Sequence, residues 1–251
     1  MTPRVIPCLL LKNGGLVKGQ KFKNDKYIGD PLNAVRVFNE KAVDELVFLD
    51  VTASTENREP NYGFLRDIAS ECFMPLAYGG GIATFEQASK VFDAGIEKVV
   101  INAAAYTNPS LITEIAKTYG TQAVVVSIDV RSTLFGKRRC ASHRGTRDHN
   151  IDPVAHAKQA ATAGAGEILL NSIDRDGTMT GYDLPLVAAV SQALDIPVIA
   201  AGGSANMEHF REALRNGASA VAAGSQFVFQ GKHRAVLITY PHPAALSELM
   251  A

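Results

Sequence analysis

Carboxylates end or follow three apolar segments of this sequence, at places where they could transfer protons. Asp50 and Asp129 each end such a segment, and Asp174 and Asp176 follow a third. A carboxylate that projects into a partly desolvated cavity can act as a general acid or base near neutral pH. Asp129 is the best candidate for that role, because its segment VVVSID is otherwise apolar. The alternative is an aspartate that only caps or fixes a loop.

Glycine-rich turns indicate a second kind of chemistry, the binding of anions. Without a Cβ atom, backbone N–H groups can approach a phosphate closely, and the N-terminus of a following helix adds a favourable dipole. Two such turns would suit a phosphorylated small molecule with a phosphate at each end, although glycines could instead only permit tight turns. The candidate phosphate-binding residues are Gly80, Gly81, Asn102, Ala103, Asp176, Gly177, Gly202, Gly203, Gly224 and Ser225.

Four charged residues stand immediately before apolar segments: Arg4, Glu45, Lys98 and Glu167. If these segments are strands of one barrel, two cations and two carboxylates face its axis at the same end. Buried charges are tolerated when they are paired, so a closed ring of alternating sign is expected. From the residues alone, the ring is either a structural plug or a gate through which a small neutral molecule passes.

Two basic stretches follow the first and the fifth apolar segments. Lys18 belongs to the first, which contains several other lysines and the glycines Gly14, Gly15 and Gly19. A glycine-hinged lid whose lysine meets a phosphorylated ligand is one interpretation, and a solvated run of charge is the other. The second stretch contains His143 and His149, which lack the spacing of metal ligands and are interpreted as loop residues.

The elements that would position these residues alternate between short apolar segments and helical stretches along the whole chain. Several of the apolar segments have no polar face, as expected for parallel strands that are covered on both sides. Eight strand–helix units in about 250 residues predict a (β/α)8 TIM barrel. The expected strands are Val5–Leu11, Leu46–Val51, Pro75–Tyr78, Val99–Asn102, Ala123–Val130, Ile168–Ser172, Pro197–Ala201 and Ala220–Ala223.

Helix boundaries are marked by capping residues. A capping side chain precedes a proline at Asp30–Pro31, Asn108–Pro109 and Asp152–Pro153, and Thr84 with Gln87 has the pattern of a capping box. Helices are expected to end at four glycines, which can adopt the left-handed conformation. These glycines are Gly95, Gly120, Gly164 and Gly217.

The sequence also repeats itself at an offset of 122 positions. Pro75–Ala103 aligns without gaps to Pro197–Ser225, and seven of the 29 aligned positions are identical. A fixed offset of half the chain predicts two similar half-barrels within one domain, 1–251, with halves of about 1–121 and 122–251. It also predicts one ligand-binding end in each half.

Composition excludes several classes of protein. The 251 residues carry 25 Lys and Arg against 25 Asp and Glu, whereas nucleic-acid-binding domains carry a basic excess. The apolar run Val5–Leu11 is too short to span a membrane, and the first residues do not resemble a signal peptide. Three widely spaced cysteines indicate neither a disulfide framework nor a zinc site. We expect a cytoplasmic protein without a metal or cofactor.

These motifs together resemble one family, the cyclase subunit of imidazole glycerol phosphate synthase in histidine biosynthesis. The resemblance runs from Arg4 to about Gly231, and its motifs include RVIPCL, DELVFLD, YGGGI, EKVVIN, GAGEILLNSIDRDGTMTGYDL and PVIAAGG. In that family a glutaminase docks on the barrel floor and releases ammonia through the axis to a bisphosphate substrate at the mouth. The resemblance implies that the four charged residues are an ammonia gate and that Asp129 is one of two catalytic aspartates.

One departure from the family pattern concerns the other catalytic aspartate. The family motif reads C-L-D where this chain reads Cys8-Leu9-Leu10, and a leucine cannot transfer a proton. Several other stretches, including LNSIDRDG and HRAVLITYP, look like a paralogue from surface-polysaccharide (O-antigen, lipopolysaccharide) gene clusters. That resemblance implies a glutaminase partner and an asparagine-synthetase-like amidotransferase, which together convert a sugar acetamido group to an acetamidino group.

Three functions are consistent with these observations. The first is an ammonia-conducting barrel subunit in sugar amidation. The second is a working cyclase in which another residue at the mouth replaces the missing aspartate at Leu10. The third is a structural or regulatory subunit that only activates the glutaminase. The related single-chain isomerase of histidine biosynthesis shares the two-half plan, but EKVVIN and GAGEILLNSIDRDG fit the cyclase.

Overall fold

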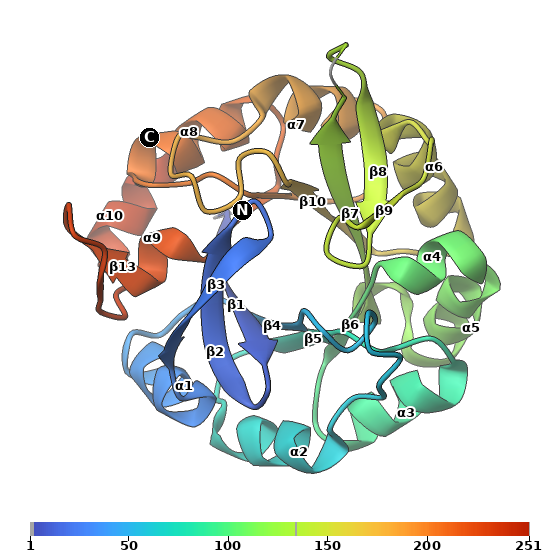
Figure 1. The fold of residues 1–251 in the computed structure, drawn as a ribbon, viewed down its shortest axis with the longest axis horizontal. Helices are drawn as coiled ribbons and strands as arrows, with labels where there is room; N and C mark the ends of the chain where they lie inside the picture. Colours follow the sequence, from blue (N-terminus) through green and yellow to red (C-terminus); the bar gives the residue numbers. More distant parts are fainter. Residues whose placement is uncertain (1–2, 134, 251) are drawn as a thin grey trace.

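The computed structural model describes residues 3–133 and 135–250. Within these residues, eight parallel strands close into a barrel, and helices form a ring around it (Figure 1). Around the barrel the order is β1, β4, β5, β6, β7, β10, β11 and β12, and β12 pairs with β1. The predicted (β/α)8 barrel is therefore confirmed.

Each barrel strand coincides with a segment that the sequence predicts, with differences of at most two residues at either end. The barrel strands are β1 (Arg4–Lys12), β4 (Leu46–Asp50), β5 (Leu76–Gly79), β6 (Lys98–Ile101), β7 (Val124–Ser132), β10 (Glu167–Ser172), β11 (Val198–Ala201) and β12 (Ala220–Ala223). The α-helices are α1 (Pro31–Glu40), α2 (Tyr62–Glu71), α3 (Phe85–Asp93), α4 (Ala103–Thr107), α5 (Ser110–Tyr119), α6 (Pro153–Ala163), α7 (Leu184–Ser191), α8 (Met207–Arg215), α9 (Ser225–Val228) and α10 (Pro243–Ser247). Two short 3-10 helices are η1 (Thr121–Ala123) and η2 (Glu248–Met250).

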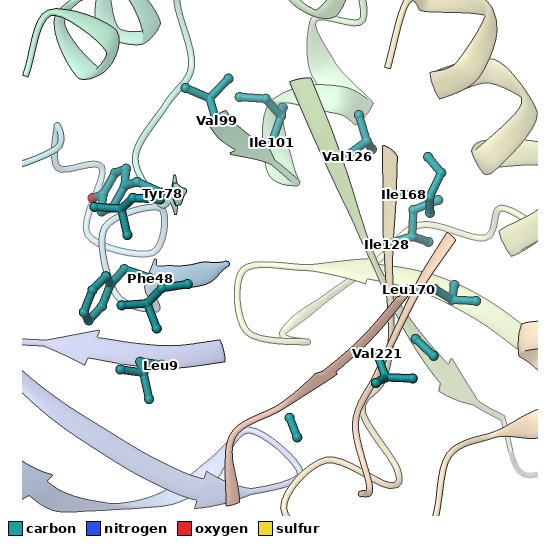
Figure 2. Close-up of a cluster of buried hydrophobic side chains, with 14 of the residues drawn as sticks. Leu9, Phe48, Tyr78, Val99, Ile101, Val126, Ile128, Ile168, Leu170 and Val221 are labelled. Carbon is teal, nitrogen blue, oxygen red and sulfur yellow. The ribbon is translucent and has the colours of Figure 1, made fainter. Parts of the chain in front are cut away.

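The barrel separates two hydrophobic cores because side chains alternate between the two faces of each strand. The outer core lies between strands and helices, and Figure 2 shows part of it, including Phe48, Tyr78 and Leu170. The inner core fills the barrel and contains residues such as Ile6 and Val47. The strands read as continuous apolar runs because both faces are covered.

Most of the expected helix boundaries are confirmed. Asp30 and Asp152 accept hydrogen bonds from backbone N–H groups at the starts of α1 and α6, and the capping box of Thr84 and Gln87 is formed in α3. The cap expected at Asn108 is wrong, because its side chain instead accepts a hydrogen bond from the Ser110 hydroxyl. The four predicted glycines all have positive φ where a helix gives way to the next strand.

The segment after the first strand is not the loop that we expected, and its role as a lid stays a prediction. The segment forms two antiparallel strands, β2 (Gly15–Gln20) and β3 (Lys23–Gly29), and β2 also pairs with β1. Apolar residues of β2 are buried in this pairing, whereas the sequence interpretation weighed only its lysines and glycines. After β7 a similar extension forms β8 (Arg138–Ser142) and β9 (Arg147–Asp148).

The C-terminal segment returns to the start of the first barrel strand. After the short hairpin of β13 (Phe229–Gln230) and β14 (Ala235–Val236), the Tyr240 hydroxyl donates a hydrogen bond of 2.8 Å to the carbonyl of Val5. This contact attaches the tail beside Arg4. No helix in the described part of the chain is long and apolar enough to cross a membrane.

Candidate functional site

Strand alternation decides which side chains of β1 face the barrel axis. Ile6 and Cys8 belong to the inner core, so Arg4 and Leu10, which are in phase with them, also face inward. Arg4 begins the strand at the floor of the barrel, and Leu10 lies near its carboxyl end at the mouth. The alternation of side chains along β1 therefore places Arg4 at the floor and Leu10 at the mouth, both facing the barrel axis.

At the floor, the four charged residues predicted from the sequence form a closed ring of ion pairs. Arg4 contacts Glu45 through Nη1 and Glu167 through Nη2, the latter at 2.8 Å. The Nζ of Lys98 lies 3.0 Å from Glu45 and 3.4 Å from Glu167. Each cation thus lies between two carboxylates, and the signs alternate around the ring.

Three members of the ring are largely removed from solvent, and the fourth, Arg4, is 29% exposed. The Glu45 side chain is 2% exposed and that of Lys98 is 16% exposed. Charges at such positions are stable because each has two oppositely charged neighbours, and removal of one member would leave a buried charge with less compensation. The geometry agrees with both sequence interpretations, a plug and a gate.

At the mouth, the structure brings the predicted site residues together around one cavity of about 1280 Å³, open solvent at its entrance included. The cavity lies at the carboxyl ends of the strands, where barrels of this architecture bind their ligands. The predicted residues that line it are Leu10, Lys18, Gly80, Gly81, Asn102, Ala103, Asp129, Asp176, Gly177, Gly202, Gly203, Gly224 and Ser225.

Asp129 is held from both sides by amide groups. The Nδ2 atoms of Asn102 and Asn171 donate hydrogen bonds to its two carboxylate oxygens, both at 3.2 Å. Burial raises the pKa of Asp129 to about 7, although the hydrogen bond from Asn171 opposes the shift. The carboxyl group can therefore both give and take a proton near neutral pH. It is not a loop cap.

Leu10 contributes an apolar side chain to this mouth. It lines the cavity together with Asp129, from the strand that begins the other half of the barrel. Cys8, one inward-facing position below it, also offers no acid or base near neutral pH, since burial raises the pKa of its thiol to about 12. Asp129 therefore has no proton-transfer partner on β1.

The glycine turns are required by the backbone at the mouth, whatever they bind. Gly203 has a φ of +114°, and a Cβ atom there would lie 2.1 Å from the carbonyl oxygen of Gly181. Gly81 has a φ of +73°, with the carbonyl oxygen of Arg58 2.3 Å from the same position. Close backbone packing thus explains these glycines.

Substitution of one of these glycines should destabilise the protein. We expect Gly203→Ala to lower the free energy of unfolding by about 1–3 kcal/mol, because the new methyl group meets a backbone carbonyl and φ is positive. Urea unfolding followed by circular dichroism measures the change. Gly63→Ala in α2 is the matched control, since its nearest neighbour would lie at 3.6 Å. If both variants have wild-type stability, the close packing at Gly203 does not constrain this turn.

Lys18 does not present a free positive charge to a ligand. Its side chain is only 5% exposed, and its Nζ lies 2.8 Å from Asp176, another predicted phosphate-binding residue. The pair joins β2 to the loop after β10. Asp50 is also engaged, because Arg58 donates two hydrogen bonds to its carboxylate.

Several residues of the mouth were not found by sequence reasoning. Asp25 on β3 pairs with Arg144, at 2.8 Å, and both line the cavity with His143. The two hairpins therefore meet over the mouth. Their signal in the sequence is weak, since His143 and Arg144 come from a stretch that was interpreted as a loop. Among the described residues, no group of three or more His, Cys, Asp or Glu residues could hold a metal ion.

The fold and this site together define a class: a (β/α)8 barrel with a cavity at its mouth that contains carboxylate and amide side chains, and a ring of four charges across its floor. Comparison with known sequences identifies the family within that class. The chain belongs to the family described as histidine biosynthesis protein, whose model matches residues 4–234.

Relatives with assigned names are similar over nearly the whole chain. A protein of Pseudomonas aeruginosa named "Putative imidazole glycerol phosphate synthase subunit hisF2" is 54% identical over 239 residues, which cover 95% of each chain. One of Vibrio vulnificus named "Putative imidazole glycerol phosphate synthase subunit hisF3" is 47% identical and covers 96% of this chain and 94% of the relative. The "Imidazole glycerol phosphate synthase subunit HisF" of Streptomyces coelicolor is 48% identical, with 90% of each chain covered.

Proposed function

We propose that this protein is a barrel subunit that receives ammonia from a glutaminase bound at its floor and conducts it along the barrel axis to the mouth. From there the ammonia serves the amidation of a surface-polysaccharide sugar, in which an acetamido group becomes an acetamidino group. The second partner is an asparagine-synthetase-like amidotransferase that carries the sugar substrate.

The observation that carries this proposal is the combination of a complete charged ring with an incomplete acid–base pair. All four members of the ring are present and paired, as a subunit that still passes ammonia would require. At the mouth, Leu10 occupies the position of one of the family's two catalytic aspartates. A protein that transports ammonia but closes no ring needs the first feature and not the second.

The names of the relatives support a role that depends on a partner. They are called subunits of imidazole glycerol phosphate synthase, and two of them carry the names hisF2 and hisF3. In this family the partner of the barrel is a glutaminase. We therefore propose the same heterodimer for this chain, with its contact at the floor around the charged ring.

Glu167→Gln tests the passage of ammonia. The substitution keeps the size of the side chain and removes the charge that holds Arg4 and Lys98. In a mixture of this protein, its glutaminase, the amidotransferase and the nucleotide-linked acetamido sugar, we expect glutamine-dependent amidation to fall about tenfold or more, because misplacement of a passage residue is costly. Amidation supported by ammonium salt should not change.

Glu86→Gln is the matched control, since Glu86 lies in an exposed ion pair with Lys90 on α3. It should leave both reactions unchanged. If Glu167→Gln has no effect on the glutamine-dependent reaction, ammonia does not pass the ring. An equal fall in both reactions would show that the ring is a structural plug.

A second function is favoured by one specific observation, the preserved mouth. Asp129 keeps its hydrogen-bond partners and the glycine turns still line the cavity, as a cyclase of histidine biosynthesis would need for a phosphorylated substrate. Under this alternative another group at the mouth supplies the proton transfer that Leu10 cannot.

A further inference from the structure

Most ionisable groups of the mouth cavity are already neutralised by a partner. Among the described residues, four carboxylates line the cavity, and three of them are in ion pairs. The pairs are Asp25 with Arg144, Asp50 with Arg58, and Asp176 with Lys18. Asp129, which only accepts hydrogen bonds from amides, and the imidazole of His143 are left as groups that can exchange protons near neutral pH.

His143 is connected to a second histidine through one buried hydroxyl. The Oγ atom of Ser142 lies 2.9 Å from Nδ1 of His143 and 2.7 Å from Nε2 of His149. Ser142 is completely buried. A hydroxyl has a single proton, so when it donates to one neutral imidazole it must accept from the other. The tautomers of the two histidines are therefore linked.

The backbone and a ring stack fix both ends of this connection. His143 has a φ of +51°, a left-handed conformation that is unfavourable for residues other than glycine, in the turn that joins β8 to β9. Because its Nδ1 contacts Ser142, its Nε2 is the nitrogen left for the cavity. The His149 ring stacks on Tyr106, with centroids 3.7 Å apart and planes within 5°.

A base at the position of His143 is needed if the nitrogen that reaches the mouth is held there as ammonium. An ionised carboxylate such as Asp129 stabilises ammonium rather than ammonia. Ammonium has no lone pair and cannot attack an acceptor, so the proton must be removed before the nitrogen reacts. Leu10 cannot remove it. Asp129 can take the proton, but the side chains that contact its carboxyl oxygens in the described part of the chain are the amide donors of Asn102 and Asn171, which cannot carry the proton away.

We propose that His143 accepts this proton and that Ser142 and His149 relay it towards the outer surface of the barrel, an inference that rests on the proposed delivery of ammonia. The ammonium ion gives a proton to Nε2 of His143 and becomes ammonia. The proton on Nδ1 of His143 moves to Ser142, the Ser142 proton moves to Nε2 of His149, and the proton on Nδ1 of His149 is released to water. One proton enters the relay and one leaves it, and both imidazoles end neutral in the opposite tautomer.

The surroundings favour neutral imidazoles. Burial and the positive charge of Arg147 lower the pKa of both histidines, and Asp148 opposes the shift at His149. Arg131 on β7 contacts Asp148, and Arg144 beside His143 is occupied by Asp25. Proton uptake is therefore followed by release, since neither imidazolium is stabilised.

Nitrogen NMR of the full-length protein labelled with 15N-histidine tests the relay, with ammonium chloride as the probe and potassium chloride at the same concentration as the control. In the wild type we expect ammonium, but not potassium, to shift the ring nitrogens of both His143 and His149. In Ser142→Ala the shift should remain at His143 and disappear at His149. In His143→Gln, which keeps a polar group beside Ser142, His149 should no longer respond.

Three results would overturn the relay: no ammonium-specific shift at His143, no response of His149 in the wild type, or an unchanged response of His149 in Ser142→Ala. The backbone amide spectrum of each variant establishes that it is folded. The experiment needs no glutaminase, so its failure is distinct from failure of the proposed function, which the Glu167→Gln assay decides.

Discussion

Leu10→Asp is expected to create cyclase activity that the wild-type protein lacks. The substitution restores a carboxylate at the end of β1, facing the cavity that Asp129 also lines. A positioned acid or base contributes about 10²–10⁴-fold to a rate, so turnover should rise by at least about two orders of magnitude above the wild-type background. The assay uses the ribulosyl bisphosphate substrate of the true cyclase with ammonium salt at alkaline pH, since free ammonia makes a glutaminase unnecessary.

Two control variants define what the new activity requires. Leu10→Asn introduces a polar side chain of the same size that cannot transfer a proton, and it should stay inactive. Asp129→Asn, added to Leu10→Asp, should abolish the activity again. Turnover by the wild type would contradict the ammonia-conduit proposal and would make this protein a histidine-pathway cyclase in which another residue replaces the aspartate. The absence of turnover in folded Leu10→Asp would show that the mouth no longer binds the cyclase substrate.

Lys98→Met is expected to cause the largest loss of stability. Lys98 bridges Glu45 and Glu167, and without it the 2% exposed carboxylate of Glu45 keeps Arg4 as its only ring partner among the described residues. Breaking a buried ion pair by removing one partner costs about 3–5 kcal/mol in the free energy of unfolding. Urea unfolding at neutral pH measures this change.

A surface substitution and a double substitution show whether the loss of stability comes from the ring or from the loss of any lysine charge. Lys90→Met breaks an exposed pair with Glu86 and should cost no more than about 0.5 kcal/mol. Adding Glu45→Leu to Lys98→Met removes the uncompensated charge as well and should recover part of the stability. If Lys98→Met is as stable as Lys90→Met, the ring does not contribute to the stability of the barrel floor.

The sequence was sufficient for the framework because the framework depends on local patterns. Several of the barrel strands are apolar on both faces, and some of the helices that follow them have marked starts, so strand positions follow from composition and capping residues. The ring at the floor was predictable for the same reason, since all four of its residues stand immediately before apolar segments that must start at one end of a parallel barrel. These residues are Arg4, Glu45, Lys98 and Glu167. The glycine turns and Asp129 follow the opposite ends of strands and had to meet at the mouth.

Only the tertiary structure showed which charged residues at the mouth pair with one another. Lys18 pairs with Asp176, and Asp25 with Arg144, across sequence separations that no periodicity reveals. The connection between His143 and His149 depends on the β8–β9 hairpin, which forms on the edge of a strand already placed in the barrel. The alternation of side chains along each strand determines which residues face the interior of the barrel, and this alternation can be read from the sequence. Closure of the barrel determines which charged residues form ion pairs and which remain able to exchange protons. Ion pairs of this kind join residues that are far apart in the chain, so the sequence alone does not reveal them.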